Sequence, residues 1–405
     1  MSNDIQPEIR FPGFTEDWEQ RKFGEMLVNL EAGVSVNSSD YDTGYFILKT
    51  SAIKMGNIDL LEVKSIVSEE VARAKTPLIK NSIIISRMNT PELVGASGLV
   101  RESIDNIFLP DRLWQGQVAG NFSPEWLIQS INIAANIKKI RDLATGTSGS
   151  MKNISKKSML DLIINVPTLE EQQKIGSFFK QLDDVISLHQ LKLDLLKEQK
   201  KGFLQKMFPK NGAKVPEIRF PGFTKDWEER KLGDVFSERS ERSSEGELIS
   251  VTINSGVIKA SELDRKDNSS DNKSNYKKVE VGDIAYNSMR MWQGASGYSS
   301  YEGILSPAYT VIIPKEGTDS KFFAYDFKRY DMIQTFKRNS QGLTSDTWNL
   351  KFPTLKLVKI MVPSIEEQKQ IAAFFERLDN TIALHERELD VLKETKKGFL
   401  QKMFV

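Results

Sequence analysis

The sequence has no cysteine, two histidines, and no apolar run approaching the length of a membrane span. Without cysteine the chain forms neither disulfides nor thiolate metal sites, and it has no cysteine nucleophile. A membrane-spanning helix needs about eighteen or more consecutive apolar residues, and the N-terminus lacks the basic and apolar segments of a signal peptide. We therefore expect a cytoplasmic protein with no membrane partner.

The sequence also has almost no net charge. Lysine and arginine together number 56, aspartate and glutamate 55, so the formal charge is +1. This balance argues against a general polycation that coats nucleic acid, but it leaves room for local basic surfaces, because phosphate binding depends on where charge lies. A hydrophobic content of 39% and a length of 405 residues are typical of a globular protein with two or three domains.

A long internal repeat is the main feature that is present. Residues 7–24 and 216–233 are identical at 15 of 18 positions, and residues 166–208 and 362–404 at 27 of 43. The segments between them, about 141 and 128 residues long, show almost no resemblance to each other. A repeat of about 200 residues is as large as a domain. The same frame around different inserts suggests one scaffold function carried out twice and one recognition function directed at two targets.

Each long repeated segment predicts a single helix. Thr168-x-x-Glu171 and Ser364-x-x-Glu367 have the capping-box pattern of a helix start. Apolar positions then recur in steps of three and four, which predicts a coiled-coil seam. The predicted seam residues are Ile175, Phe179, Leu182, Ile186, His189, Leu193 and Leu196 in the first helix, and Ile371, Phe375, Leu378, Ile382, His385, Leu389 and Leu392 in the second. Lys200 and Lys396 continue the seam, and we expect their stems to pack while their ammonium groups reach water.

Chain connectivity predicts how the two helices pair. Only residues 209–215 separate the end of the first helix from the second copy of the lead-in segment. The second helix must therefore run back along the first, which makes the pair antiparallel, relates the halves by a pseudo-two-fold axis and places Phe404 near the segment that begins at Pro7. About 39 residues give a helix of roughly 55–60 Å. We predict four parts: recognition domains at 1–165 and 216–361, a central helix and linker at 166–215, and a C-terminal helix at 362–405.

Both inserts read as α/β (α+β) domains with a curved, mainly antiparallel sheet. Short β-rich runs are separated by turns rich in glycine, serine and asparagine. We predict strands at 45–48, 82–86, 93–100, 162–166, 283–286, 308–313 and 356–362, and helices at 125–143 and 320–338. Gly95–Gly98 and Gly294–Gly297 read as turns.

No set of residues in the sequence predicts catalysis. There is no phosphate-binding loop of the GxxxxGK[ST] type and no GxGxxG after a strand. His189 and His385 occupy the same heptad position, and we interpret them as polar seam residues that fix helix register rather than as a metal or proton site. We therefore assign no catalytic residue, no metal ligand and no cofactor to this chain.

Polar loops in both inserts carry the residue types that read bases. Arginine with asparagine or glutamine forms paired hydrogen bonds to guanine and adenine, and small hydroxyls with lysine suit phosphate contacts. The candidates are Arg87, Asn89, Thr90, Arg112, Trp114, Thr147, Ser148, Lys152 and Asn153 in the first insert, and Arg290, Trp292, Gln293, Arg338, Gln341, Thr344 and Ser345 in the second. Each loop taken alone could equally be an ordinary solvated turn. Their recurrence before the Gly-Ala-Ser-Gly turn and before the long helix favours recognition.

With these features together, the chain resembles the specificity subunit of type I restriction–modification systems. The matching residues are Val166-Pro167 with Glu170-Glu171-Gln172, Val362-Pro363 with Glu366-Glu367-Gln368, and the PGFxxDWExRKxG lead-in to each half. The resemblance covers essentially the whole chain. It implies that each insert is a target recognition domain that reads one half of a split site in double-stranded DNA.

The same resemblance implies where the chemistry lies. Two modification subunits would methylate adenine with S-adenosylmethionine, and two restriction subunits would translocate and cleave DNA with ATP and magnesium, so that this chain is not itself an enzyme. Two alternatives stay open from the sequence alone. A self-contained nuclease or methyltransferase would need a catalytic constellation, and a two-headed protein–protein scaffold would show no salt-dependent DNA binding.

Overall fold

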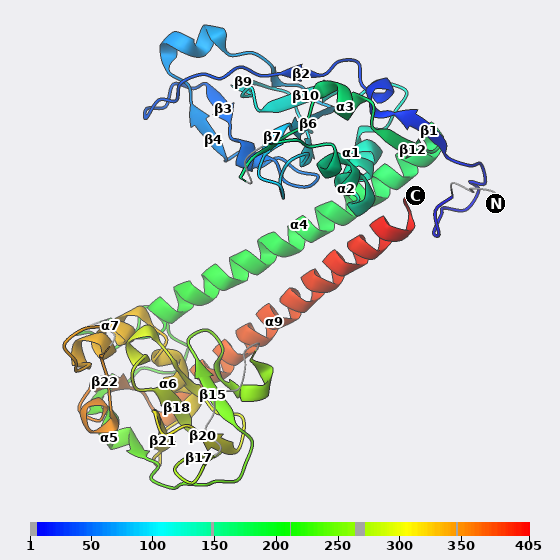
Figure 1. Ribbon diagram of the computed structural model, residues 1–405. Coiled ribbons are helices and arrows are strands. Elements are labelled where there is room, and N and C mark those ends of the chain that lie inside the picture. The colour runs from blue at the N-terminus through cyan, green and yellow to red at the C-terminus, as the bar shows by residue number, and fades with distance from the viewer. Residues whose placement is uncertain (1–5, 147–149, 211, 264–271, 346) are drawn as a thin grey trace. The chain divides into compact units, whose positions relative to one another are not determined.

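The computed structural model describes residues 6–146, 150–210, 212–263, 272–345 and 347–405. The chain divides into two compact units, and each is described by itself. The first comprises residues up to 190 together with 387–405, and the second comprises 191–386. Each unit therefore contains one insert and part of each long helix, labelled α4 and α9 in Figure 1.

The first insert is built on two four-stranded sheets. One has the order β2-β10-β6-β8 and the other β4-β3-β9-β5, and among the strand pairs of the described residues only β3–β9 is parallel. The strands are β1 (Glu19–Lys22), β2 (Glu31–Ala32), β3 (Phe46–Leu48), β4 (Val63–Ser65), β5 (Pro77–Leu78), β6 (Ser82–Ser86), β7 (Met88–Asn89), β8 (Ser97–Leu99), β9 (Ile104–Phe108), β10 (Leu113–Gln117), β11 (Lys152–Asn153) and β12 (Ile163–Val166). Two further pairs are β1–β12 and β7–β11.

Strand β6 shows why this sheet lies at the centre of the unit. Its three isoleucines are completely buried, and because successive side chains point to opposite faces, Ile83 and Ile85 enter one core while Ile84 enters another. Helices close the unit: α1 (Pro124–Asn132), α2 (Ala134–Asp142), α3 (Lys156–Leu160), and the short 3₁₀ turns η1 (Phe23–Met26), η2 (Thr50–Ala52) and η3 (Ser68–Arg73).

The second insert repeats the central sheet with a different periphery. Its four-stranded sheet has the order β14-β21-β18-β19, and β13–β22, β15–β16 and β17–β20 form pairs. The strands are β13 (Glu228–Lys231), β14 (Phe236–Glu238), β15 (Ile249–Thr252), β16 (Gly256–Lys259), β17 (Lys277–Val279), β18 (Ile284–Asn287), β19 (Ser296–Tyr298), β20 (Gly303–Leu305), β21 (Tyr309–Pro314) and β22 (Lys359–Val362). The helices are α5 (Leu232–Val235), α6 (Ser320–Asp326), α7 (Tyr330–Asn339), α8 (Phe352–Leu355), η4 (Ala260–Glu262) and η5 (Met291–Gln293).

Two predicted helices are each broken in two. The chain is extended at Ile133 (ψ 150°) between α1 and α2, and Asn136 donates its side-chain amide to Ser130 O, the carbonyl that Ala134 N would bind in a continuous helix. The chain is again extended at Arg329 (ψ 146°) between α6 and α7, where the guanidinium pairs with Asp326. Periodicity alone did not reveal either break.

Two predicted strands and both predicted turns are shorter than expected. Of residues 93–100 only Ser97–Leu99 form a strand, and of 356–362 only Lys359–Val362 do. The Gly-Ala-Ser-Gly segments are turns only at their first residues, since Gly95 and Gly294 have φ of +80° and +84° while Ser97 and Ser296 already begin β8 and β19. Glycine is suited to that left-handed backbone.

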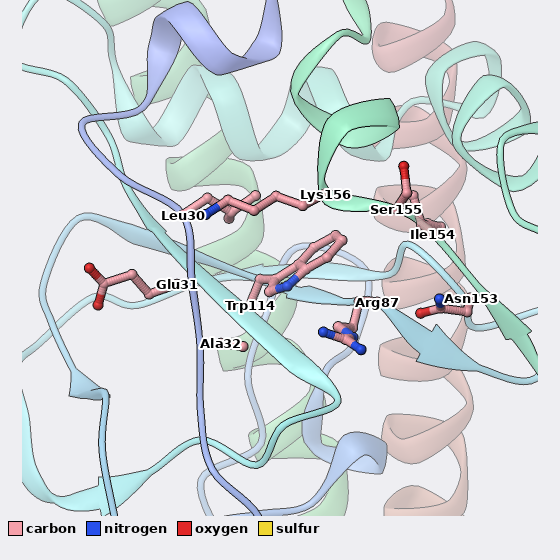
Figure 2. A pocket seen from close by; sticks show the side chains of 9 residues that line it. All are labelled: Leu30, Glu31, Ala32, Arg87, Trp114, Asn153, Ile154, Ser155 and Lys156. Atoms are coloured by element: carbon pink, nitrogen blue, oxygen red, sulfur yellow. The ribbon is translucent and has the colours of Figure 1, made fainter.

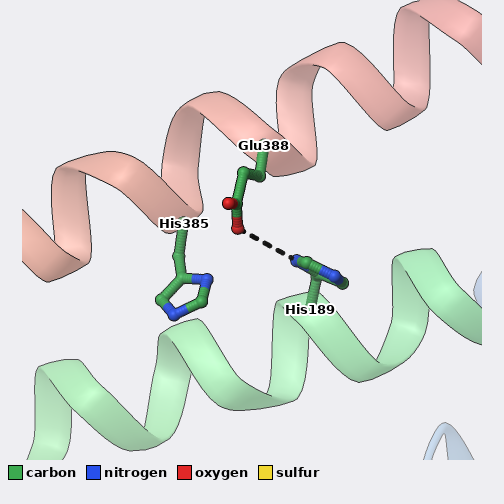
Figure 3. Close-up of side chains that lie close together, drawn as sticks. All are labelled: His189, His385 and Glu388. Atoms are coloured by element: carbon green, nitrogen blue, oxygen red, sulfur yellow. Dashed lines mark ion pairs between the residues drawn. The ribbon is translucent and has the colours of Figure 1, made fainter.

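Within each unit the long helices α4 (Leu169–Lys206) and α9 (Ile365–Lys402) run antiparallel, as predicted. In the first unit Lys396 Nζ lies 2.6 Å from Asp183 Oδ1, and His189 Nδ1 lies 3.7 Å from Glu388 Oε2 (Figure 3). In the second unit Lys200 Nζ lies 2.5 Å from Asp379 Oδ1. Both seam lysines are half-buried, with side chains 28% and 21% exposed, and each ammonium group also pairs with an aspartate of the other helix. None of the described helices is both long and apolar enough to cross a membrane.

Burial along the helices follows the 3.5-residue period. Every predicted seam residue is buried or half-buried, from Ile175 to Leu196 and from Ile371 to Leu392. In contrast, Leu188, Leu191 and Leu195 on α4 are 56–67% exposed although they are equally apolar. Position in the heptad, rather than side-chain type, separates the two groups.

The end of each long helix completes a core. Phe404 packs against Trp18 and Phe179, with ring centroids 6.1 and 5.8 Å away. Ile9 N donates to Lys402 O at 2.9 Å, so the predicted proximity of Phe404 to the segment after Pro7 is confirmed. In the second unit Phe208 packs against Trp227 at 6.1 Å in the same manner.

The beginning of each long helix is held by the lead-in segment. Arg10 donates two hydrogen bonds to the buried Glu171 carboxylate, at 2.7 and 2.8 Å, and Arg219 does the same to Glu367. Glu171 N donates to Thr168 Oγ1 at 3.4 Å, so the predicted hydroxyl cap is present. The second bond of the predicted capping box, from the N-cap backbone N–H to the glutamate side chain, is wrong. The carboxylate binds the arginine of the lead-in segment instead.

Candidate nucleic-acid interface

In the first insert, strand pairing brings separate predicted loops together. Strand β11 pairs with β7, which places Lys152 opposite Asn89 and Asn153 opposite Met88. Asn153 is held further by backbone hydrogen bonds in both directions with Thr145, at 2.8 and 2.9 Å. Residues about 60 positions apart in sequence therefore form one surface.

This surface borders an open cleft of about 540 Å³ (Figure 2). Its lining residues are Leu30, Glu31, Ala32, Arg87, Trp114, Asn153, Ile154, Ser155 and Lys156. The Arg87 guanidinium lies 5.6 Å from the centre of the Trp114 ring, a cation–π contact. Arg87 Nε and Asn153 Oδ1 are buried and have no hydrogen-bond partner among the described residues. An unsatisfied donor and acceptor in one cleft are typical of a site that binds water or a ligand.

The other first-insert candidates differ in what they offer. Trp114 is only 3% exposed, so it supports Arg87 and is not available to stack on a base. Asn89 uses its amide within its own turn, donating to Ser86 Oγ and accepting from Thr90 N. Arg112 is exposed, and its carbonyl accepts from Arg87 N. Thr147 and Ser148 lie outside the described residues.

In the second insert the candidates gather around the η5 turn. Arg290 is exposed, and its Nη1 donates to Gln293 Oε1 at 3.1 Å. Trp292 donates its indole N–H to Met289 O and meets Trp348 edge-to-face, with ring centroids 5.2 Å apart. Polar and aromatic side chains therefore share one surface.

The Lys328 side chain stabilises the η5 turn through hydrogen bonds to backbone carbonyls. Its ammonium group donates to Gly294 O at 2.6 Å, at the end of η5, and to Ile253 O at 2.8 Å, beyond β15. Burial, with the nearby charge of Lys200, lowers the pKa of Lys328 to about 8. Lys328 was not among the candidates predicted from the sequence, because a lysine in the short turn between α6 and α7 carries no local sign of such contacts.

The remaining second-insert candidates lie on α7 and the loop after it. Gln341 exchanges backbone hydrogen bonds with Asn349, at 2.8 and 3.0 Å. Thr344 N donates to Thr347 Oγ1, and Arg338 donates to Thr335 Oγ1. Ser345 is exposed. Thr344 is therefore committed through its backbone to a turn, while Gln341 and Arg338 keep exposed side chains.

Equivalent positions in the two inserts follow from matching hydrogen bonds. Ile154 N donates to Arg87 O, and Leu350 N donates to Ser288 O, so Arg87 corresponds to Ser288. Arg87 and Arg290 are not equivalent, because Arg87 directly follows β6 whereas Arg290 lies three residues beyond β18.

The same correspondence identifies two residues that the sequence analysis missed. Asn349 corresponds to Asn153, and its Oδ1 is also buried without a partner among the described residues. Trp348 corresponds to Lys152. Each asparagine lies thirteen residues before the valine that opens the long repeat, Val166 or Val362. This equal spacing is the sequence feature that could have matched the two asparagines.

Comparison with known proteins places the chain in a family. Residues 15–198 and 224–394 each match the family described as type I restriction modification DNA specificity domain. The chain is 24% identical over 403 residues, 95% of this chain and 92% of the relative, to a putative type I restriction enzyme MjaX specificity subunit of Methanocaldococcus jannaschii. It is 25% identical to the MjaVIII specificity subunit of the same organism, over 68% of each chain.

A solved structure shows the same fold. The S subunit of a type I restriction–modification system from M. genitalium superposes with a TM-score of 0.62 at 15% identity, covering 99% of both chains. These comparisons do not favour the two-headed protein–protein scaffold. The chain belongs to the type I restriction–modification DNA specificity family and contains two of its domains.

Proposed function

We propose that this chain gives a type I restriction–modification complex its DNA sequence specificity, with each recognition domain reading one half of a split duplex site. The supporting observation is that each unit gathers arginine, tryptophan and amide side chains beyond equivalent strands, β6 and β18, on a duplicated frame. Those side chains suit base edges in the major groove. Since the two sets differ, the two half-sites differ in sequence.

The chain acts without catalysis of its own. Two modification subunits transfer the methyl group from S-adenosylmethionine to adenine, and two restriction subunits use ATP and magnesium to translocate and cleave DNA. We infer that the length of the paired helices sets the spacing between half-sites. Family membership supports this division of labour.

Exchange of one insert tests the proposal. Residues 25–165 would be replaced by the equivalent segment of another specificity subunit, and the methylated motif read from genomic DNA of cells that also express the modification subunits. We expect one half-site to change and the other to stay, because the inserts differ while the frames are shared. A change in both half-sites contradicts independent reading.

The purified chain supplies the control. Alone with S-adenosylmethionine it should leave DNA unmethylated, and adenine methylation by the isolated chain contradicts the proposal. Together with modification subunits it should bind target duplex with an affinity that falls steeply with salt, because phosphate contacts release counterions. Equal affinity for target and scrambled duplex would show that the chain does not confer sequence specificity.

A further inference from the structure

The two recognition domains differ in chemistry at one equivalent position. Lys152 and Trp348 each directly precede the matched asparagines, Asn153 and Asn349, and those asparagines have the same backbone bonds. At this place the first domain presents an ammonium group and the second an indole. The first cleft adds Arg87 and Lys156 to this basic surface.

The indole of Trp348 belongs to an apolar patch. It meets Trp292 edge-to-face. The side-chain N–H of Trp292 already donates to Met289 O, so Trp292 presents only apolar surface to a ligand. Met289, whose carbonyl accepts that bond, is itself 47% exposed. Exposed apolar groups in the middle of a polar surface are typical of a binding contact.

One cation contacts this patch, and two more lie close to it in sequence. Lys337 Nζ lies 5.6 Å from the centre of the Trp348 ring, and Arg338 follows it on α7. Arg290 lies two residues before Trp292 and is exposed. An apolar centre bordered by positive charge is complementary to the major groove, where methyl groups of thymine lie between two phosphate backbones.

We propose that the second recognition domain reads thymine through its C5-methyl groups, with Trp292 and Trp348 as the contacting side chains, whereas the first domain reads its half-site through hydrogen bonds and charge. This rests on the proposed function. In the major groove the methyl group distinguishes thymine from cytosine and from the purines. Loss of one methyl group that is buried in the interface weakens DNA binding about fourfold.

Deoxyuridine tests this without altering the protein. The complex with modification subunits would be titrated with duplexes in which the thymines of one half-site are replaced by deoxyuridine, which lacks only the methyl group. The insert exchange identifies the half-site of each domain. We expect about fourfold weaker binding for each methyl group lost from the second half-site, and less than a twofold change in the first.

Several outcomes overturn the inference while leaving the proposed function intact. They are equal sensitivity of both half-sites to deoxyuridine, no sensitivity in the second, or a second half-site that contains no thymine on either strand. Failure of the proposed function looks different, because normal target and scrambled duplex would then bind alike.

Substitution at the equivalent position sharpens the test. Trp348→Lys places the first domain's residue in the second, and we expect sensitivity to deoxyuridine to fall while the salt dependence rises by about one phosphate contact. Trp348→Phe keeps an aromatic ring and should keep the sensitivity. The matched control, Lys152→Ala, should reduce salt dependence and leave the response to deoxyuridine unchanged. If Trp348→Lys stays as sensitive to deoxyuridine as the wild type, Trp348 does not contact the thymine methyl groups.

Discussion

The two units make the same contacts between the lead-in segment and the long helix. They differ at the ends of their central strands, where each insert exposes its candidate recognition residues. Arg10 and Arg219 bind Glu171 and Glu367 with the same pair of hydrogen bonds. At the ends of the central strands, by contrast, Arg87 packs over Trp114 while its counterpart Ser288 shares a hydrogen bond with Thr310 at 2.8 Å.

This difference shows which positions the fold restricts. The arginine–glutamate pairs are buried, and losing one partner would leave a buried charge, so substitution there is costly. Positions beyond β6 and β18 lie at a sheet end, where several packings satisfy the same strand register. Specificity can therefore change at those positions without changing the frame.

The largest expected effect comes from the phenylalanines at the helix ends. Phe404→Ala should destabilise the first unit and Phe208→Ala the second, each by about 3–5 kcal/mol, because each leaves a cavity in one core. Hydrogen exchange of the buried strands β6 and β18 would report each unit separately. The exposed Leu343→Ala serves as control, with a change within about 0.5 kcal/mol. Equal loss of protection in both strands would show that the cores are not independent.

Removing one buried carboxylate should have the next largest effect. Glu171→Gln should cost about 3 kcal/mol in the first unit, since it leaves the Arg10 charge without its partner, and Glu367→Gln should do the same in the second. The double variant Arg10→Met/Glu171→Met should recover much of that loss. Asp161→Asn, which breaks the exposed pair with Lys22, should cost far less, because solvent screens that pair. Similar costs for buried and exposed pairs would contradict this account.

Loss of the two arginines should affect DNA discrimination by about 1–3 kcal/mol. Arg290→Ala should relax specificity in one half-site without changing stability, because Arg290 is exposed. Arg87→Ala should act on the other half-site and also lower stability, because its packing on Trp114 is lost. Binding to substituted half-sites and thermal unfolding would separate these effects. Uniform weakening on all sequences would identify phosphate contacts instead, and unchanged affinity would place the arginines away from DNA.

The smallest expected effect concerns pH and only the second unit. Lys328 has its pKa lowered to about 8, mainly by burial, so between about pH 8 and 10.5 the unfolded chain binds more protons than the folded one. Stability should therefore rise with pH in that window, by up to about 1 kcal/mol per pH unit. Unfolding of wild type and Lys328→Met from pH 7.5 to 9.5 would measure it, with Lys315→Met as an exposed control. An identical pH dependence in wild type and Lys328→Met would show that Lys328 stays charged.

Sequence reasoning succeeded where the signal was local or repeated. The helix seam, its antiparallel pairing within each unit and the position of Phe404 all follow from period and connectivity. It failed at the breaks at Ile133 and Arg329, where the backbone is extended although the hydrophobic period continues. It also did not reveal that Arg87 corresponds to Ser288, because similar residues before similar turns do not show which residues a distant strand contacts.

The sequence by itself determined the duplicated frame, the two long helices and the kinds of side chain available for recognition. Those properties reside in neighbouring residues and in their repetition. Tertiary structure alone decided that Trp114 is buried behind Arg87, that Asn153 and Asn349 are equivalent, and that Trp348 joins Trp292. Each of these depends on pairing between segments far apart in the chain, and the register of such pairing is set by the packing of the whole core rather than by local preference.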